Sequence, residues 1–332
     1  MRRWLIPVLG LAFFLVASLA TEQAQGQTVH KLGYSGSGIG ADDLIQVMLK
    51  EKLWQKHGFD ITPVYFNSGS LLGQALLAGE IQSSESDVPT MLNLAVSGAL
   101  DIKLIAVTFN RLEHSFLVNK AIKTPEDLKG KKIAISRFGS ASDVTTRLVL
   151  RFWKLNPEKD LAILQSGNTP TRLASLAAGH VDGALINPAY VHRVLASGCC
   201  RVLADLSDLP MDYARTGQVV PAGLLRTHRQ TLKRYLEAII EGIHAYKTKP
   251  RVVLQVYAEQ GLKDPEAAKQ IYERISRSLR EYPVPEPQGV QAVLDSLSHP
   301  KARGAKAADF FDSSLLEEIK ASGFIDRVYG RK

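Results

Sequence analysis

A short run near the start of the chain has the spacing of a nucleotide-binding turn. The stretch "KLGYSGSGIGADD" at 31–43 places Gly36, Gly38 and Ala41 in the pattern G-x-G-x-x-A. In dinucleotide-binding folds such glycines let the backbone approach a pyrophosphate where a helix begins. A stretch of this kind can bind an anionic group through its backbone N–H groups.

Two features of the sequence argue against a dinucleotide as the ligand. That fold needs an acidic residue at the end of its second strand to bind a ribose. Here the second expected strand ends in "NSG" at 67–69, and Asp60 precedes the strand instead. The matching turn later in the chain, "SRFGSAS" at 136–142, lacks the glycine pair. We therefore expect no cofactor.

Patterns for catalysis are also absent from the sequence. "GYSGS" at 33–37 differs from the G-x-S-x-G nucleophile elbow, because Ser37 replaces the last glycine. The eight histidines show no H-E-x-x-H or other paired spacing for a metal. His114 could approach Ser35 in a closed cleft, but a polar hinge residue is the alternative. We expect no metal, no catalytic residue and no enzymatic activity.

The N-terminal residues have the features of a secretory signal. Arg2 and Arg3 precede an unbroken apolar run of 17 residues at 4–20, and "SLA" and "AQG" offer small-x-small cleavage sites. We expect residues 1–26 to be a signal peptide and leader, cleaved on export to the periplasm. An uncleaved membrane anchor is the alternative, for which the run is at the short limit. Export also limits access to nicotinamide cofactors.

The net charge of +8 comes from lysines and arginines scattered over expected helical faces. Nucleic-acid binding favours a clustered basic stripe, so we expect no nucleic-acid partner. The two cysteines, Cys199 and Cys200, are adjacent and have no zinc-site spacing. A disulfide between neighbours is a strained ring, so the sequence predicts two unpaired thiols near a strand start, with a redox role as the alternative.

The chain contains one unit twice. "YSGSGIGADD" aligns with "ISRFGSASDV", and "LLAGEIQSSESDVP" aligns with "LAAGHVDGALINPA". Each unit reads as strand, helix, strand, helix, strand, with one helix expected over 44–58 and a capping box from Thr124 to Asp127. Alternating strands and helices predict an α/β fold with parallel sheets between helices. Residues 221–332 read as further helices that pack back on these units.

Small polar residues dominate the loops that follow the expected strands. In parallel sheets ligands bind beyond the carboxyl ends of the strands, near helix N-termini that favour anions. Arg111 and Arg137 lie in these loops and could hold a carboxylate, sulfonate or phosphate. Alternatives remain: the serines could cap helices, Asp87 and Asn187 could form turns before prolines, and the arginines could form salt bridges.

Five stretches of the sequence resemble a known family. They are "LGYSGSGIGA", "TPEDLKGKKIAISRFGSASD", "LAAGHVDGALINP", "RVLADLSDL" and "FIDRVYG". They are similar to the type II solute-binding proteins of ABC importers, in the branch that handles nitrate, taurine, alkanesulfonates and thiamine-pyrimidine precursors. The resemblance implies two α/β lobes, each a mostly parallel sheet flanked by helices, with crossing segments near 109–113 and 211–217. Lobe I would then comprise 27–110 and 214–332, and lobe II would comprise 111–213.

The resemblance implies a monomeric periplasmic receptor that delivers a small solute to an ABC permease in the inner membrane. An anionic sulfonate, carboxylate or pyrimidine-like solute is expected, and a secreted enzyme or a sensor or adaptor ectodomain is the alternative. Eleven residues are expected to contact the solute: Ser35, Ser37, Ser70 and Asp87 from lobe I, Arg137, Ser140, Ser142 and Asn187 from lobe II, and Asn110, Arg111 and Tyr213 from the crossings. Arg137→Ala is expected to cost about 1.5–3 kcal/mol of binding.

Overall fold

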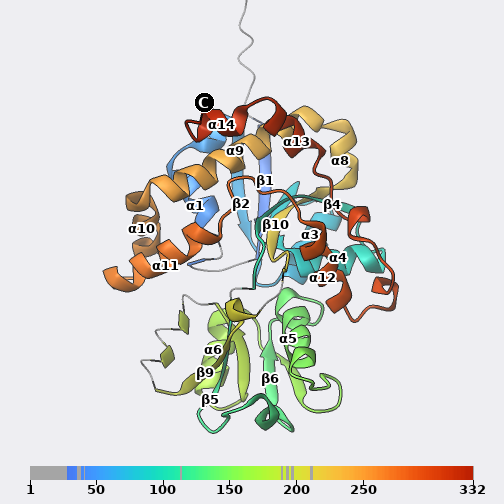
Figure 1. The fold of residues 1–332 in the computed structure, drawn as a ribbon, viewed down its shortest axis with the longest axis vertical. Helices are drawn as coiled ribbons and strands as arrows, with labels where there is room; N and C mark the ends of the chain where they lie inside the picture. The colour runs from blue at the N-terminus through green and yellow to red at the C-terminus, as the bar shows by residue number, and fades with distance from the viewer. Residues whose placement is uncertain are drawn as a thin grey trace, which may run out of the picture.

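The structure is a computed structural model that describes residues 28–35, 39–40, 42–112, 114–187, 190–191, 194–195, 198–209 and 212–331. The expected signal segment at 1–26 and the expected contact Ser37 lie outside these residues. Two five-stranded sheets form two lobes, drawn one above the other in Figure 1. Within the described residues no helix is both long enough and apolar enough to cross a membrane.

The first lobe is built on a sheet with the strand order β2-β1-β3-β10-β4. β1 pairs in parallel with β2 and β3, whereas β10 pairs antiparallel with β3 and β4. The strands of this sheet are β1 (Thr28–Tyr34), β2 (Phe59–Tyr65), β3 (Ser83–Asp87), β4 (Ile102–Phe109) and β10 (Thr216–Pro221).

The second lobe has a sheet with the strand order β7-β6-β8-β5-β9. β6 pairs in parallel with β7 and β8, and β5 pairs antiparallel with β8 and β9. Position by position this is the arrangement of the first sheet, so the duplication predicted from the sequence reappears as a repeated topology. The strands are β5 (Ser115–Asn119), β6 (Lys132–Ile135), β7 (Ala162–Gln165), β8 (Gly183–Ile186) and β9 (Cys200–Asp205).

One strand in each sheet runs against the other four, so the sheets are mixed rather than wholly parallel. In both cases this strand arrives from the other lobe: β5 follows β4 after 110–114, and β10 follows β9 after 206–215. β4 ends at the edge of its sheet that faces the second lobe. The next strand therefore starts at the edge where the parallel strands of the second sheet end, and it runs in the opposite direction.

The first predicted helix is two helices in the structure. The pattern predicts one helix over 44–58, but α1 (Asp43–Lys50) and α2 (Leu53–Lys56) are separated by Lys52, whose φ of 53° is left-handed. A left-handed residue ends a right-handed helix. The break lets the fully buried Trp54 stack on Tyr235, with ring centroids 5.3 Å apart. The single-helix prediction is therefore wrong, because core packing redirects the chain here.

The remaining helices lie around the two sheets. α3 (Gly69–Leu77) and α4 (Val88–Ser97) belong to the first lobe, and α5 (Ala141–Phe152) and α6 (Thr169–Ala177) belong to the second. The predicted capping box at Thr124 is present, although it opens only a 3₁₀ turn at Pro125–Leu128. The chain after β10 covers the first lobe in Figure 1 with α8 (Ala222–Thr227), α9 (Arg229–Thr248), α10 (Pro250–Glu259), α11 (Pro265–Ser278), α12 (Pro287–Ser296), α13 (Ser314–Ala321) and α14 (Phe324–Val328).

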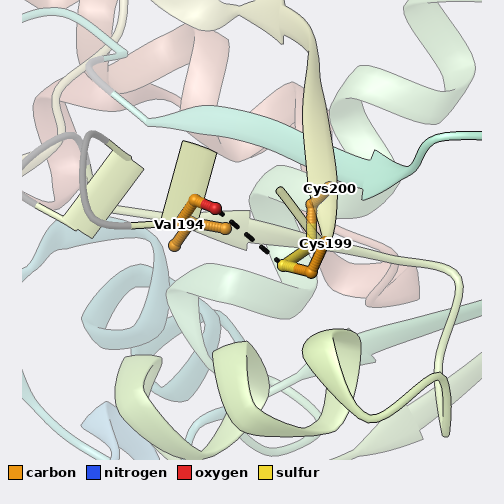
Figure 2. The surroundings of a disulfide bond; sticks show 3 residues. All are labelled: Val194, Cys199 and Cys200. Carbon is orange, nitrogen blue, oxygen red and sulfur yellow. Dashed lines mark hydrogen bonds between the residues drawn. A yellow bond between two sulfur atoms is a disulfide. The ribbon is translucent and has the colours of Figure 1, made fainter. Parts of the chain in front are cut away.

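Cys199 and Cys200 form a vicinal disulfide at the start of β9. The sequence-based prediction of two unpaired thiols is therefore wrong. Cys200 is buried, and the sulfur of Cys199 lies 4.0 Å from the carbonyl oxygen of Val194 (Figure 2). The segment folds so that the neighbouring side chains turn toward each other, an arrangement that spacing alone does not reveal. Neither cysteine lines the cavity between the lobes.

Candidate functional site

A small, polar cavity of about 80 Å³ lies where the strand-end loops of the two lobes meet. Both sheets contribute, because the residues that follow β1, β2 and β3 face those that follow β6, β7 and β8. The cavity is lined by Ser35, Asn67, Ser68, Gly69, Glu85, Ser86, Asp87, His114, Ser136, Ser140, Ala141, Ser142, Asn168, Thr169, Arg172, Asn187, Arg215 and Thr216.

Five of the eleven residues predicted to contact a solute line this cavity. They are Ser35, Asp87, Ser140, Ser142 and Asn187. Four of them follow a strand and Asp87 ends one, as expected for sites at the carboxyl edge of parallel strands. Strand ends in the sequence therefore predict five residues of this cavity, and their contact with a solute stays a prediction.

Arg137, the arginine that the sequence singles out, lies outside the cavity. Its side chain is exposed at the tip of a turn. A 3.2 Å hydrogen bond from the Ser140 N–H to the carbonyl oxygen of Arg137 closes that turn. The serines on either side of the tip, Ser136 and Ser140, are buried and line the cavity. Turn geometry thus directs the serines inward and the arginine to solvent.

Four other predicted contacts also lie outside the lining of the cavity. Arg111 is exposed and borders a separate hollow with Asp208 and Asp212. Ser70 donates a 3.4 Å hydrogen bond to the Phe138 carbonyl oxygen, which joins the two lobes beside the cavity.

Tyr213 and Asn110 lie in the crossing segments as predicted, but they face the protein interior. Tyr213 is fully buried within an apolar cluster that spans both lobes, and its hydroxyl lies 3.3 Å from the Thr145 hydroxyl. Asn110 is buried beside it and is absent from the cavity lining. The crossings are therefore held by core packing, which leaves these polar groups unavailable to a solute.

Four helices begin at the cavity. Ser68 caps α3, Ser140 caps α5 and Asn168 caps α6, each accepting a hydrogen bond from a backbone N–H of the first turn. α4 begins directly after Asp87, whose side chain makes no cap hydrogen bond. Helix N-termini carry partial positive charge and free N–H groups. Their convergence makes the cavity favourable for an anion.

Arg172 adds a buried positive charge to the same cavity. It is 4% exposed, and its guanidinium donates to the carbonyl oxygens of Gly167 and Leu185 and to the Thr169 hydroxyl. Burial lowers its pKa to about 10, with Asp87 opposing that change, so the group stays charged at neutral pH. These bonds fix the guanidinium at the start of α6.

Arg215 is a second buried arginine on the cavity wall. It is 7% exposed, and its guanidinium lies over the Phe109 ring, 5.2 Å from the centroid. Sequence reasoning missed both arginines. A usable signal for Arg172 is its position four residues before the buried Leu176, on the apolar face of α6. A charged residue on such a face is often functional.

Two buried acids complete the charges of the cavity. Burial raises the pKa of Asp87, while Arg215 and Arg172 act against the rise. Burial raises the pKa of Glu85 to about 8, with Asp42 and Asp43 raising it further and Gln218 and Arg215 opposing. Asp87 is thus balanced by two cations, whereas Glu85 is protonated at neutral pH.

Three hydroxyls form a triangle at the start of α5. Ser136, Ser140 and Ser142 lie 2.8–2.9 Å from one another, and the Ser136 N–H donates to the Ser142 hydroxyl at 2.8 Å. Each hydroxyl can both donate and accept, so the triangle can turn its protons toward a bound acceptor. Two of these residues were predicted, and Ser136 joins them through the turn.

Ser35 and His114 both line the cavity, and no hydrogen bond joins their side chains. The Ser35 hydroxyl and His114 Nδ1 are buried, and neither has a hydrogen-bond partner. Burial lowers the pKa of His114 well below its usual value, with Arg215 and Arg172 lowering it further. General-base activation requires a hydrogen bond between the two groups. Among the described residues, no group of His, Cys, Asp and Glu is arranged to hold a metal ion.

Comparison of the sequence with models of protein families finds one match. Residues 50–252 match the model described as "NMT1/THI5 like". The chain belongs to the NMT1/THI5-like family. The resemblance predicted from the sequence is thereby confirmed at the level of the family, and the matched residues include strands of both lobes.

Three known proteins show what this family member resembles. The taurine-binding periplasmic protein of Escherichia coli K12 is 27% identical over 57% of this chain and 58% of its own length. The alkanesulfonate-binding protein SsuA of Xanthomonas axonopodis pv. citri, bound to MOPS, has a TM-score of 0.67 at 21% identity, covering 82% of this chain and 91% of its own. The desulfurization enzyme DSZB has a TM-score of 0.63 at 14% identity, covering 88% and 99%. The predicted two-lobed binding-protein fold is confirmed.

Proposed function

We propose that the chain is the solute-binding component of an ABC importer and that it captures a small anionic organic solute between its lobes. The convergence of four helix N-termini and Arg172 on one cavity between the lobes carries this proposal. The taurine-binding and alkanesulfonate-binding relatives support a sulfonate, with carboxylates and pyrimidine-like compounds as further candidates.

The solute contacts that we propose come from both lobes. Backbone N–H groups at the starts of α5 and α6 and the guanidinium of Arg172 would hold the acidic group. We keep Ser35, Asp87, Ser140, Ser142 and Asn187 from the sequence-based set and add Glu85, Ser136, Arg172 and Arg215.

Closure of the lobes would follow from contacts that a solute makes with both sides. A ligand shifts a protein toward the conformation that it binds more tightly. Hydrogen bonds already join the lobes. Asn168 Nδ2 donates to Tyr65 Oη at 3.4 Å beside the cavity, and Arg151 Nη1, in the last turn of α5, donates to the Ser296 carbonyl oxygen at 2.9 Å. A solute in the cavity would add its own contacts to these and favour the closed form.

We propose that the protein acts in the periplasm as a monomer, after export and cleavage within 1–26. Loaded protein would dock on a permease in the inner membrane. N-terminal sequencing of protein from a periplasmic fraction tests the export step: a start after Ala20 or Gly26 supports it, and an intact Met1 contradicts it. Stimulation of ATP hydrolysis by the reconstituted permease tests the partner.

Calorimetric titration of the purified protein tests the binding function. Ethanesulfonate, propanoate, nitrate and a pyrimidine are the probes, and the proposal expects saturable binding of at least one anion at a 1:1 ratio. Recovery of the bound compound unchanged separates a receptor from an enzyme on the same scaffold. Chemical conversion of the compound would favour the enzyme, for which the similarity to DSZB is the supporting observation.

A further inference from the structure

The end of the second lobe that points away from the first lobe gathers cations from separate parts of the chain. β5 ends there, β9 starts there because it runs antiparallel to β5, and β6, β7 and β8 also start there. This end lies at the bottom of Figure 1. We call it the basic end, and its cations are Lys120, Lys123, Lys129, Lys131, Lys132, Lys154, Lys159 and Arg201.

Backbone contacts bring these segments side by side. The Gly130 N–H donates to the Asp160 carbonyl oxygen at 2.6 Å, so the loop before β6 touches the loop before β7. A Cβ added at Gly198 would lie 3.6 Å from Lys120 Nζ, which places that ammonium beside the start of β9. Cations that are scattered along the sequence therefore form one surface in the fold.

The cations of the basic end lack acidic partners. Among the described residues, none of these eight side chains forms a salt bridge. Exposed cations of the first lobe are different, because many of them pair with a glutamate of the same lobe. Those pairs are Lys50–Glu259, Lys56–Glu241, Lys249–Glu51, Arg229–Glu318, Arg280–Glu286 and Arg331–Glu281.

Acids at the basic end are fewer and are held by other groups. Asp127, Asp160 and Asp182 accept hydrogen bonds from backbone N–H groups. Glu158 forms salt bridges with two arginines of α5, and Glu126 is exposed. With eight cations against these five acids, the basic end carries net positive charge.

Lysine predominates at the basic end, and apolar surface is scarce. Phe152, which ends α5, is the exposed large hydrophobic residue at this end within the described part of the chain. Interfaces between proteins have apolar cores that are depleted of lysine. A phospholipid bilayer with anionic headgroups needs no such core, since each lysine near its surface contributes through its charge. The composition of this surface therefore fits an anionic bilayer better than a protein.

We propose that the basic end adsorbs to a bilayer of anionic phospholipids and holds the protein at the surface of the membrane. The proposal goes beyond solute capture and requires no bound solute. The cavity between the lobes lies at the opposite edge of the second sheet, beyond the ends of β6 and β8, so adsorption does not cover it. A receptor held on the same surface as a permease would also meet it at a higher effective concentration.

Sedimentation with vesicles tests this proposal. One set of vesicles holds phosphatidylcholine alone, and a second set holds phosphatidylcholine and phosphatidylglycerol in equal parts. Protein from a periplasmic fraction is expected to sediment with the second set in dilute buffer and to stay in solution with the first. Added salt should release it, because ions screen charges beyond the Debye length. Phosphate and chloride at equal ionic strength should release it equally, because the protein binds a charged surface rather than single phosphate groups.

A triple variant of the basic end removes three of its charges. Lys123→Gln, Lys129→Gln and Lys159→Gln together should weaken adsorption about ten-fold or more, since each lysine contributes separately near an anionic surface. All three side chains are exposed, so the variant should keep the unfolding temperature of wild type.

The matched control removes the same charge from the first lobe. Lys31→Gln, Lys263→Gln and Lys269→Gln change three exposed positions there, and together they should alter adsorption by less than about two-fold. All three proteins are purified in the same processed form, so residues 1–26 contribute equally to each measurement.

Four results would overturn the proposal. Equal sedimentation with both sets of vesicles would indicate apolar adsorption, and equal weakening in both variants would indicate an effect of net charge alone. Greater release by phosphate than by chloride would indicate a site for phosphate groups. Failure of wild-type protein to sediment would show that the surface does not bind a bilayer. Solute binding is measured separately by calorimetry, so the receptor function is tested independently of this inference.

Discussion

Asp87 and Arg172 come from opposite lobes and act on each other across the cavity. Asp87 ends β3 of the first sheet, and Arg172 lies in the first turn of α6 on the second. The charge of Arg172 lowers the pKa of Asp87 and the charge of Asp87 raises that of Arg172, each against the effect of burial. The pair places opposite charges on the two lobes at the point where a solute would enter.

Arg172→Ala should weaken solute binding more than any change of an exposed arginine. Loss of a charge-assisted bond costs about 1.5–3 kcal/mol, which is ten-fold or more in affinity. Arg137→Ala should leave the affinity within about two-fold, because Arg137 is exposed outside the cavity. Calorimetric titration of both variants with 2-aminoethanesulfonate measures the difference. The reverse order of effects would restore the sequence-based assignment of Arg137.

Because Arg172 also bonds to Gly167 and Leu185, its removal should lower stability as well. Thermal unfolding of Arg172→Ala without solute measures this separate cost. Titrations are run below the unfolding temperature of the variant, so that weak binding reflects the site and not loss of the fold.

Stability without solute should fall as the pH rises toward 8. The pKa of Glu85 is about 8 in the folded protein against a usual 4.5, so between these values the folded state holds a proton that the unfolded state has lost. The stabilisation is complete below pH 4.5 and is lost as the pH rises through 8. Asp42 and Asp43 act in the same direction, with pKa values raised by burial to about 6 and 7.

Between pH 6.5 and 8 both Glu85 and Asp43 contribute to the decline, and the difference between wild type and Glu85→Gln isolates the contribution of Glu85. His30 works in the opposite direction, because burial lowers its pKa from 6.5 to about 4, but above pH 6.5 it is neutral in both states. In Glu85→Gln the free energy of unfolding should decline less steeply in this window than in wild type. Above pH 8 it should exceed the wild-type value by roughly 1–3 kcal/mol. Urea unfolding at several pH values measures the free energy of unfolding. Identical slopes of this free energy against pH in both proteins would contradict the raised pKa of Glu85.

Gly217→Ala should disrupt the pairing of β10 with the edge strand β4 of the first sheet. An added Cβ on β10 would lie 2.6 Å from Leu104 Cδ1 and would also collide with the Ala106 carbonyl oxygen of β4. Overpacking of this kind costs about 1–3 kcal/mol. Gly223→Ala is the matched control, since a Cβ there meets no atom within 4 Å and alanine favours the helix α8. Equal unfolding temperatures for the two variants would contradict the described packing.

Reduction of the disulfide should leave the unfolding temperature almost unchanged. A bond between residues 199 and 200 closes no loop of chain, so it restricts the unfolded state very little. Thermal unfolding with and without dithiothreitol measures the effect. Labelling of the native, unreduced protein by a thiol reagent would show that the bond is absent.

The fold could be predicted further from the sequence than the site. Strand ends, caps and the internal repeat are local patterns, and they predict the two α/β units and five residues that line the cavity. The break at Lys52 depends on packing between distant segments, which local spacing does not express. Whether Arg137 or Arg172 lines the cavity depends on which of the two side chains points inward, one from a turn and the other from a helix face. That direction is set by neighbours remote in the chain.

The exchange of strands between the sheets has a consequence for synthesis on the ribosome. Neither β3 nor β4 can pair on their facing sides until β10 emerges, more than a hundred residues after β4. The nascent first half would present unpaired strand edges, which are prone to intermolecular association. A fragment that stops before residue 216 would keep these edges unpaired and should therefore be less soluble than the full chain.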